Sequence, residues 1–406
     1  MSEKKEEKLD LSTIIPGKIH TRFTNKIYPL NVALEKENVL ISRRRQKHSQ
    51  RIIKTGIKTP KNHICIWYRW PCGRNQTSNK NNGFRYKYLV LPRYLSLDDT
   101  TLTSLGLLEA EMETSVKNSC GTSFNNSEPE LINHVIYFLK RFGIGEKELH
   151  WCITFNYKLL AQETPYISQL REKFSEEFWV RNTSISPQMK NRKFLIYTGN
   201  KMNPNFGTNT IKLGTLRIGY YDIIFRMIIL QLLRTIKDIL LNSKNEELIK
   251  NYMKGIFAGE CDIKLTRSGS VDSVRIGCMN RNNKKFYRKC LKLIGVIPSK
   301  YEGNSINIHS QKNFIKIFDL GLVDIHPIRY VKFLSGLMKF KKFNNHELKK
   351  SFENMQVNII NKLEKTKFLL SGRTSKSREI DGIYNMVRPR RNEFKPVSGW
   401  KRIQFN

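Results

Sequence analysis

Two glutamates hold matching places in two similar apolar segments of this 406-residue chain. The first segment runs from Ser104 to Met112 and contains Glu111, and the second runs from Met253 to Cys261 and contains Glu260. Each reads glycine, two apolar residues, any residue, a small residue and then the glutamate. Carboxylate oxygens, with waters and phosphate oxygens, are the ligands that Mg²⁺ prefers. A metal held between the two glutamates would activate water and stabilise a leaving oxygen.

Both segments are expected to lie in helices, over residues 102–112 and 246–260. Small residues recur four positions apart in each segment, so they share one helix face. Glycine inside a helix costs about 1 kcal/mol relative to alanine, and its presence in both helices predicts that the two helices pack closely on each other. The predicted interface consists of Gly106, Ala110, Gly255 and Gly259. Packing there brings the two glutamates together at the helix ends, where their repulsion favours a proton or a divalent cation.

The residues after each of these helices follow similar patterns. After the first we expect a strand near 123–125, a helix capped by Ser127 with Pro129 in its first turn, and a strand over 151–156. After the second we expect strands over 262–267 and 271–279, a helix over 284–294 and a strand over 305–309. Residues 138–144 align with 290–296. The pattern predicts an α+β fold with a duplication, in which 214–241 forms a strand and a long closing helix.

The charge of the chain points to a polyanionic partner. It has 72 Lys and Arg against 35 Asp and Glu, a formal net charge of +37. Nucleic acid fits such a footprint better than a membrane surface does, and solubility alone needs far less charge. The densest basic stretch, 43–61, begins with Arg43, Arg44 and Arg45, which we expect to contact phosphates. Aromatic runs follow at 64–70 and 84–91, and a packed β-hairpin explains these as well as base or sugar contacts do.

Several other classes of protein do not fit the sequence. The first residues lack the apolar stretch of a signal peptide. The apolar run 223–241 is interrupted by charged residues, which indicates a buried amphipathic helix and not a membrane span. The seven cysteines are scattered without a Cys-x-x-Cys pair, which favours reduced thiols over a zinc site. We therefore expect a cytoplasmic, nucleoid-associated protein, and an organellar location stays open.

The two segments around Glu111 and Glu260 resemble the motif of the LAGLIDADG homing endonucleases, in the single-chain form with two motifs. Each segment fills all nine places of that motif, and the eighth place holds the acid that is the family's metal ligand. The phrases at 124–131 and 142–144 are similar to archaeal or phage-type members. The chain departs from the motif at the ninth place, where Met112 and Cys261 replace the usual glycine, and at the sixth, which holds Glu109 in the first copy and Ala258 in the second. The usual glycine lets the chain leave the helix in a tight turn, so its replacement affects the position of each glutamate.

The resemblance implies two pseudo-symmetric αββαββα repeats whose antiparallel sheets form a saddle over double-stranded DNA. It implies a monomer that uses Mg²⁺ or Mn²⁺ at Glu111 and Glu260, with a basic residue nearby, for which Lys332 is the candidate. Alternate strand residues would then face the major groove. On the second sheet the candidates are Lys264, Arg267 and Arg275, although ordinary solvated charge explains any one of them equally well.

These inferences divide the chain into four parts. Residues 1–99 form a basic and aromatic extension, 100–243 the first repeat with an insertion at about 157–207, 244–345 the second repeat, and 346–406 a helical and basic extension. The competing hypothesis is a non-catalytic DNA- or RNA-binding protein on the same fold, such as an intron maturase, which would bind intron RNA, or a regulator. A ribosomal component would explain the charge but not the paired segments. An acid kept in both segments favours the enzyme, since a pure binder needs neither.

Overall fold

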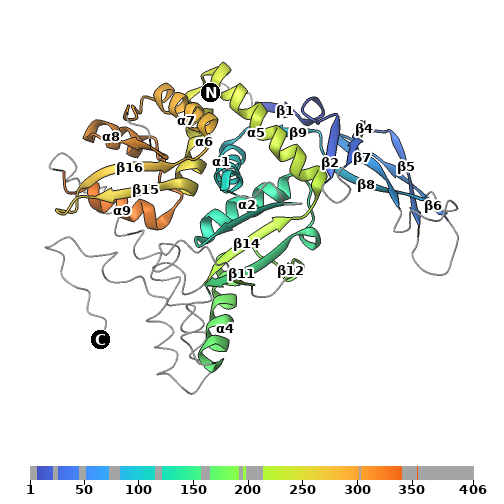
Figure 1. The fold of residues 1–406 in the computed structure, drawn as a ribbon, viewed down its shortest axis with the longest axis horizontal. Helices are drawn as coiled ribbons and strands as arrows, with labels where there is room; N and C mark the ends of the chain where they lie inside the picture. The colour runs from blue at the N-terminus through green and yellow to red at the C-terminus, as the bar shows by residue number, and fades with distance from the viewer. Residues whose placement is uncertain are drawn as a thin grey trace.

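The computed structural model describes residues 7–21, 26–44, 52–72, 83–114, 121–156, 165–191, 195–197, 214–300, 303–340 and 354. They form a mixed α+β fold, the class predicted from the sequence. Two mainly antiparallel sheets lie on either side of a central pair of helices, and a third, N-terminal β region lies beside them (Figure 1). The predicted helical and basic extension at 346–406 lies outside the described residues, apart from residue 354.

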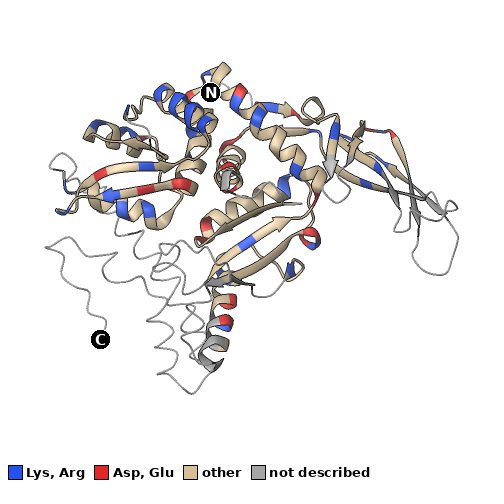
Figure 2. Ribbon diagram, viewed as in Figure 1, with Lys and Arg blue, Asp and Glu red and all other residues tan. Residues whose placement is uncertain are grey.

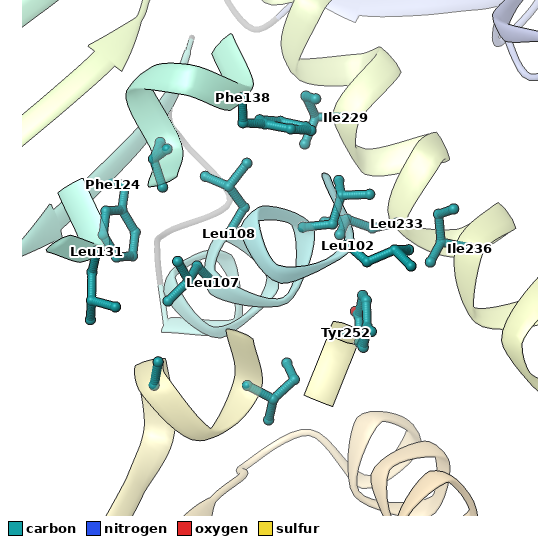
Figure 3. Close-up of a cluster of buried hydrophobic side chains, with 14 of the residues drawn as sticks. Leu102, Leu107, Leu108, Phe124, Leu131, Phe138, Ile229, Leu233, Ile236 and Tyr252 are labelled. Carbon is teal, nitrogen blue, oxygen red and sulfur yellow. The ribbon is translucent and has the colours of Figure 1, made fainter. Parts of the chain in front are cut away.

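The central pair consists of α1 (Asp99–Thr114) and α6 (Glu246–Glu260). Residues 101–110 of helix α1 are all buried, so every side of the helix is covered by protein. Its side chains Leu102, Leu107 and Leu108 are fully buried among residues of neighbouring helices and strands (Figure 3). Helix α6 begins where the Asn245 side chain accepts hydrogen bonds from the backbone of the first turn. The hydrophobic core is therefore built around the two helices that carry the motif segments.

The first sheet follows α1. Its elements in chain order are β10 (Thr122–Asn126), α2 (Pro129–Arg141), β11 (His150–Asn156), α4 (Pro165–Asn182), β12 (Lys190–Asn191), β13 (Leu195–Tyr197), β14 (Thr215–Tyr220) and α5 (Ile223–Ser243). Strand β14 lies between β10 and β11 and is antiparallel to both, while β12 and β13 run parallel to β11. The predicted cap of α2 is wrong by one residue, because Glu128 is the N-cap and makes no side-chain capping bond. The predicted insertion contains α4, β12 and β13.

The second sheet follows α6. Its elements are β15 (Cys261–Leu265), β16 (Val271–Gly277), α7 (Arg281–Leu293), β17 (Ser305–Ile308), α8 (Gln311–Asp319) and α9 (Pro327–Leu337). The strands lie in the order β15-β16-β17 and are antiparallel. Apolar side chains such as Ile263, Val274 and Ile306 alternate with polar ones, so one face of the sheet joins the core and the other stays open.

The two halves share local geometry. Helices α2 and α7 are both 13 residues long, and each is followed two positions later by a glycine with positive φ, Gly143 at 71° and Gly295 at 78°. The sequence patterns give the strands at 151–156 and 305–309 the same place in the two halves, but the sheet order shows that this correspondence is wrong. Strand β17 pairs directly with β16, whereas β11 is separated from β10 by β14. In its pairing, β17 corresponds to β14, because β14 pairs directly with β10 as β17 pairs with β16. The insertion places β14 far from β10 in the sequence, although the two strands are neighbours in the sheet.

The N-terminal region is made of short β-ribbons. The pairs are β1 (Lys8–Asp10) with β9 (Tyr94–Ser96), β2 (Lys18–Thr21) with β3 (Lys26–Pro29), β5 (Asn38–Arg44) with β6 (Ile52–Lys58), and β4 (Asn31–Ala33) with β7 (His63–Cys72), which also pairs with β8 (Gly83–Pro92). Ile64 and Ile66 of β7 join the main core, while Cys65 joins a second small cluster on the other face. An ion pair of 2.9 Å joins Lys87 of β8 to Asp222, the N-cap of α5, and ties this region to the first sheet.

Candidate active site

The site is built on a backbone-to-backbone contact between α1 and α6. A Cβ atom built on Gly106 would lie 2.3 Å from the carbonyl oxygen of Tyr252, and one built on Gly255 would lie 2.1 Å from that of Thr103. The Thr103 hydroxyl also donates a 3.0 Å hydrogen bond to the carbonyl of Asn251. No side chain fits between the helices at this point, which is the physical reason for glycine at both positions.

The close contact continues to the end of both helices. A Cβ atom on Gly259 would lie 2.5 Å from the Cβ atom of Ala110. Each of these residues directly precedes a motif glutamate, so Glu111 and Glu260 emerge at the same end of the helix pair. Burial raises the pKa of the Glu111 carboxyl to about 7; the guanidinium of Arg217 opposes the rise, and the charge of Glu260 adds to it. The two carboxylates therefore influence each other electrostatically.

The raised pKa of Glu111 predicts a pH-dependent stability. Below about pH 4.5 the carboxyl is protonated in the folded and unfolded states, and above it the folded state holds the proton more tightly until the pH passes about 7. In the absence of metal, the Glu111 carboxyl should therefore lower the free energy of unfolding by up to about 3 kcal/mol as the pH rises from 5 to 8. Urea unfolding in a chelator at both pH values measures the change. The variant Glu111→Gln should lose this part of the pH dependence, and an unchanged dependence would contradict the assignment.

Glu260 lies in a different environment. A Cβ atom on Gly277 of β16 would lie 3.0 Å from Oε2 of Glu260, so the glycine leaves room for the carboxylate. The buried guanidinium of Arg329, on α9, donates to the last carbonyls of α6: 2.9 Å to Phe257, a shorter bond to Ala258, and 3.4 Å to Gly259. A cation at a helix C-terminus is stabilising. Arg329 thus fixes the end of α6 from which Glu260 projects.

Replacing Arg329 by methionine is expected to destabilise the fold by about 3 kcal/mol, because hydrogen bonds to a buried charged group are lost and carbonyls stay unsatisfied. Chemical denaturation measures this. The control is Arg267→Met, which changes an exposed turn residue and should stay within about 0.5 kcal/mol of the unmodified chain. Equal unfolding midpoints for the two variants would mean that Arg329 does not hold the helix end.

The other predicted catalytic residue, Lys332, lies one turn of α9 away from Arg329. Its Nζ atom lies 3.7 Å from Oδ1 of Asp262, two positions beyond Glu260, and the side chains of Lys332 and Asp262 are 42% and 63% exposed. The lysine therefore lies on the Glu260 side of the helix pair, where it pairs with a carboxylate at the start of β15.

The predicted DNA-contacting residues of the second sheet differ in their surroundings. Lys264 is exposed on β15, and Arg267 is exposed in the turn that follows. Arg275 of β16 is half-buried and donates to Oδ1 of Asn307 at 3.1 Å and to Oγ of Ser305 at 3.3 Å. These bonds lie across the open polar face, so the Arg275 side chain is held along the sheet.

The first sheet carries a similar arginine that the sequence reasoning missed. Arg217 of β14 donates a 3.0 Å hydrogen bond to Oγ of Ser123 on β10, and it is close enough to Glu111 to act on its pKa. The alternation in β14, where Leu216 and Ile218 are buried, was the signal that could have found it. Both open faces therefore hold an arginine hydrogen-bonded to a serine of the neighbouring strand.

Glu109, in the sixth motif place, has a structural environment. It is buried, forms a short ion pair with Lys237 of α5 and accepts a 2.6 Å hydrogen bond from the hydroxyl of Tyr252. Lys237 also donates to Asn283 of α7 at 2.7 Å. This cluster joins α1, α5, α6 and α7 in the interior, and its charges compensate one another.

Of the predicted N-terminal contact residues, Arg43 and Arg44 lie in β5, opposite Ile53 and Ile52 of β6, and Arg45 lies outside the described residues. Five cysteines, Cys65, Cys152, Cys261, Cys278 and Cys290, are buried free thiols. Within the described ranges, His, Cys, Asp and Glu side chains form no group of three or more that could hold a metal ion. No helix in the described part of the chain is long and apolar enough to cross a membrane.

Comparison with known proteins gives no assignment. No protein-family model matches this chain, and no curated protein sequence matches it.

Proposed function

We propose that this protein is a site-specific double-stranded DNA endonuclease of the LAGLIDADG homing type, which hydrolyses phosphodiesters with a divalent cation at Glu111 and Glu260. The observation that carries the proposal is the junction of α1 and α6. Two glutamates leave the same end of two helices in backbone contact, and each helix leads toward a sheet with one open polar face. Such an arrangement places two carboxylates next to a surface on which a duplex can lie.

The shared order of elements supports a pseudo-symmetric pair of repeats. In each half the motif helix leads to a strand, a 13-residue helix that ends near a left-handed glycine, an antiparallel partner strand and a further helix. The phosphates of a duplex carry negative charge along the full length of the site. The chain's +37 charge is complementary to them, and Figure 2 shows lysine and arginine on both halves of the molecule.

The side chains at the junction fit a magnesium or manganese ion. Mg²⁺ is commonly held by one or two carboxylates, with waters and substrate phosphates completing its shell, so Glu111 and Glu260 are a sufficient protein contribution. The gap beside Gly277 leaves the Glu260 carboxylate room to reach it. A bound cation would supply activation of water and stabilisation of the leaving oxygen.

The chain's own residues would prepare the site in different ways. Arg329 fixes the end of α6 and so orients Glu260. Arg217 opposes the rise in the pKa of Glu111 and so favours the ionised form that binds a cation. Lys332, beside Asp262, is the candidate for a cation that contacts substrate phosphate. As a monomer with both motifs in one chain, the protein would not need a second copy to complete the junction.

The test is incubation of the full chain with a randomised duplex library and Mg²⁺, followed by sequencing of the cut ends. A recurring sequence at the ends, lost in a chelator and lost in the double variant Glu111→Gln, Glu260→Gln, is the expected result. Enrichment of bound duplexes without cut ends would instead support a non-catalytic DNA-binding protein on the same fold. Selective retention of RNA over the duplex would support the maturase alternative.

A further inference from the structure

Helix α7 carries a basic stripe that the proposed cleavage does not use. The stripe consists of Arg281, Lys285, Lys289 and Lys292, all exposed and all on one face of the helix at intervals of three or four residues. Helix α7 contains no acidic residue, and none of these four cations forms an ion pair with any residue that the structure describes. Figure 2 shows the row of basic residues along α7.

The stripe points away from the open face of the second sheet. The opposite side of α7 buries Phe286, Tyr287 and Leu291 in the same core that receives the apolar face of β15, β16 and β17. Because the helix covers the apolar face, its exposed side lies on the reverse of the surface proposed for the cleaved duplex. The stripe therefore cannot contact the same stretch of a straight duplex as the open sheet does.

Stability of the helix does not explain this stripe. Like charges four positions apart, such as Arg281 and Lys285, destabilise a helix. A cation in the first turn, where Arg281 lies, opposes the helix dipole. Helix α2, which has the same length and also packs against its sheet, offers a comparison. It has two basic residues, and Lys140 and Arg141 are both neutralised by ion pairs, with Glu146 and Asp98.

We propose that the outer face of α7 is a second, sequence-independent binding surface for double-stranded DNA, so that one molecule holds two duplex segments at once. The proposal rests on the proposed function in taking duplex DNA as the ligand. Successive cations are about 6 Å apart along the helix, which lets several phosphates of one backbone be contacted together. Phosphate contacts carry no sequence information.

The exposed side chains favour a duplex over a single strand. Proteins that bind single strands provide aromatic side chains on which bases stack. The aromatic residues of α7, Phe286 and Tyr287, are buried, and its exposed positions hold only Arg, Lys and Asn. The surface continues past the end of α7, where the side chain of Lys316 lies beside Gly295. This surface therefore offers charge without stacking.

The experiment uses the full chain bound to an immobilised duplex and measures capture of a second, fluorescent duplex of unrelated sequence at about 50 mM salt. The test variant replaces the four stripe residues by glutamine, Arg281→Gln, Lys285→Gln, Lys289→Gln and Lys292→Gln. The control variant makes the same change in net charge at exposed positions elsewhere, Lys18→Gln, Lys147→Gln, Lys190→Gln and Lys244→Gln. Capture of the second duplex should fall about tenfold or more in the test variant. The slope of the logarithm of its affinity against the logarithm of the salt concentration should be smaller in magnitude by about 3 to 4.

Equal capture of the second duplex by the test and control variants would overturn the inference. It would also be overturned if each unmodified molecule binds only one duplex at saturation. Stronger competition by single-stranded RNA than by duplex DNA would also overturn it. One-to-one binding with normal cleavage would leave the proposed function intact and remove only this inference. Bridging of two duplexes without cleavage of any library member would support this inference and contradict the proposed endonuclease function.

Discussion

A leucine at position 255 is expected to abolish the packing of α1 on α6 and to unfold the chain. The first atom of any side chain there would lie 2.1 Å from the carbonyl oxygen of Thr103 and 2.9 Å from the Cα atom of Gly106. Both neighbours are backbone in a buried helix, so no side chain can rotate away to make room. Overpacking in a well-packed core costs about 1–3 kcal/mol and occasionally more, and this clash is at the upper end because two helix backbones must separate.

The measurement is the unfolding midpoint in urea together with the elution volume of the purified variant. The control is Gly17→Leu, because a Cβ atom there meets no other atom within 4 Å. Gly106→Leu should behave like Gly255→Leu, since the contact is reciprocal. If the Gly255→Leu variant unfolds at the same urea concentration as the Gly17→Leu control, the two helices are not in backbone contact. The proposed site at their ends would then lose its structural basis.

The features that the sequence predicted are those encoded locally. The helix expected over 246–260 matches α6, because Asn245 supplies a cap and the apolar face has helical spacing. The small residues in both motif segments predicted a close helix pair, since glycine inside a helix has a cost that only packing offsets. The turn at 268–270 separates two strands with alternating polarity, and the structure has β15 and β16 there.

What the sequence did not predict depends on contacts between distant residues. Strand β14 lies between β10 and β11, although α4 and the rest of the predicted insertion separate it from β11 in the chain. Alternation of polarity indicates a strand but not its neighbour in a sheet. For the same reason, the approach of Arg217 to Glu111 and of Arg329 to the end of α6 leaves no trace in a local motif.

The two carboxylates at the junction are consequently unequal. Glu111 is half-buried and feels the charge of Arg217, whereas Glu260 lies at a helix end that Arg329 of α9 holds. The motif positions alone would make them equivalent, because they share a place in the same pattern. The unequal surroundings make it necessary to test each glutamate separately.

Changing either Glu111 or Glu260 to glutamine is expected to lower the rate of DNA cleavage by a factor of about 100 or more, equivalent to almost 3 kcal/mol of transition-state stabilisation. The substitution removes a charged metal ligand but keeps nearly the same shape. The helix contact uses Gly106, Gly255 and Gly259, so the fold should be retained. Binding of duplex in a chelator should be unchanged or tighter, because one negative charge near the phosphates is gone.

Cleavage, duplex affinity and melting are measured on the same preparations, and the matched control is Glu246→Gln, an exposed glutamate at the other end of α6. The control should cut at the unmodified rate and lose only about 0.3–1 kcal/mol of stability, the contribution of an acid at a helix N-terminus. Glu111→Gln should also lose the pH dependence of stability that its raised pKa produces. If both glutamine variants at the junction cut as fast as this control, the glutamates do not bind the metal. The nuclease proposal would then give way to a DNA-binding protein that keeps the fold without the chemistry.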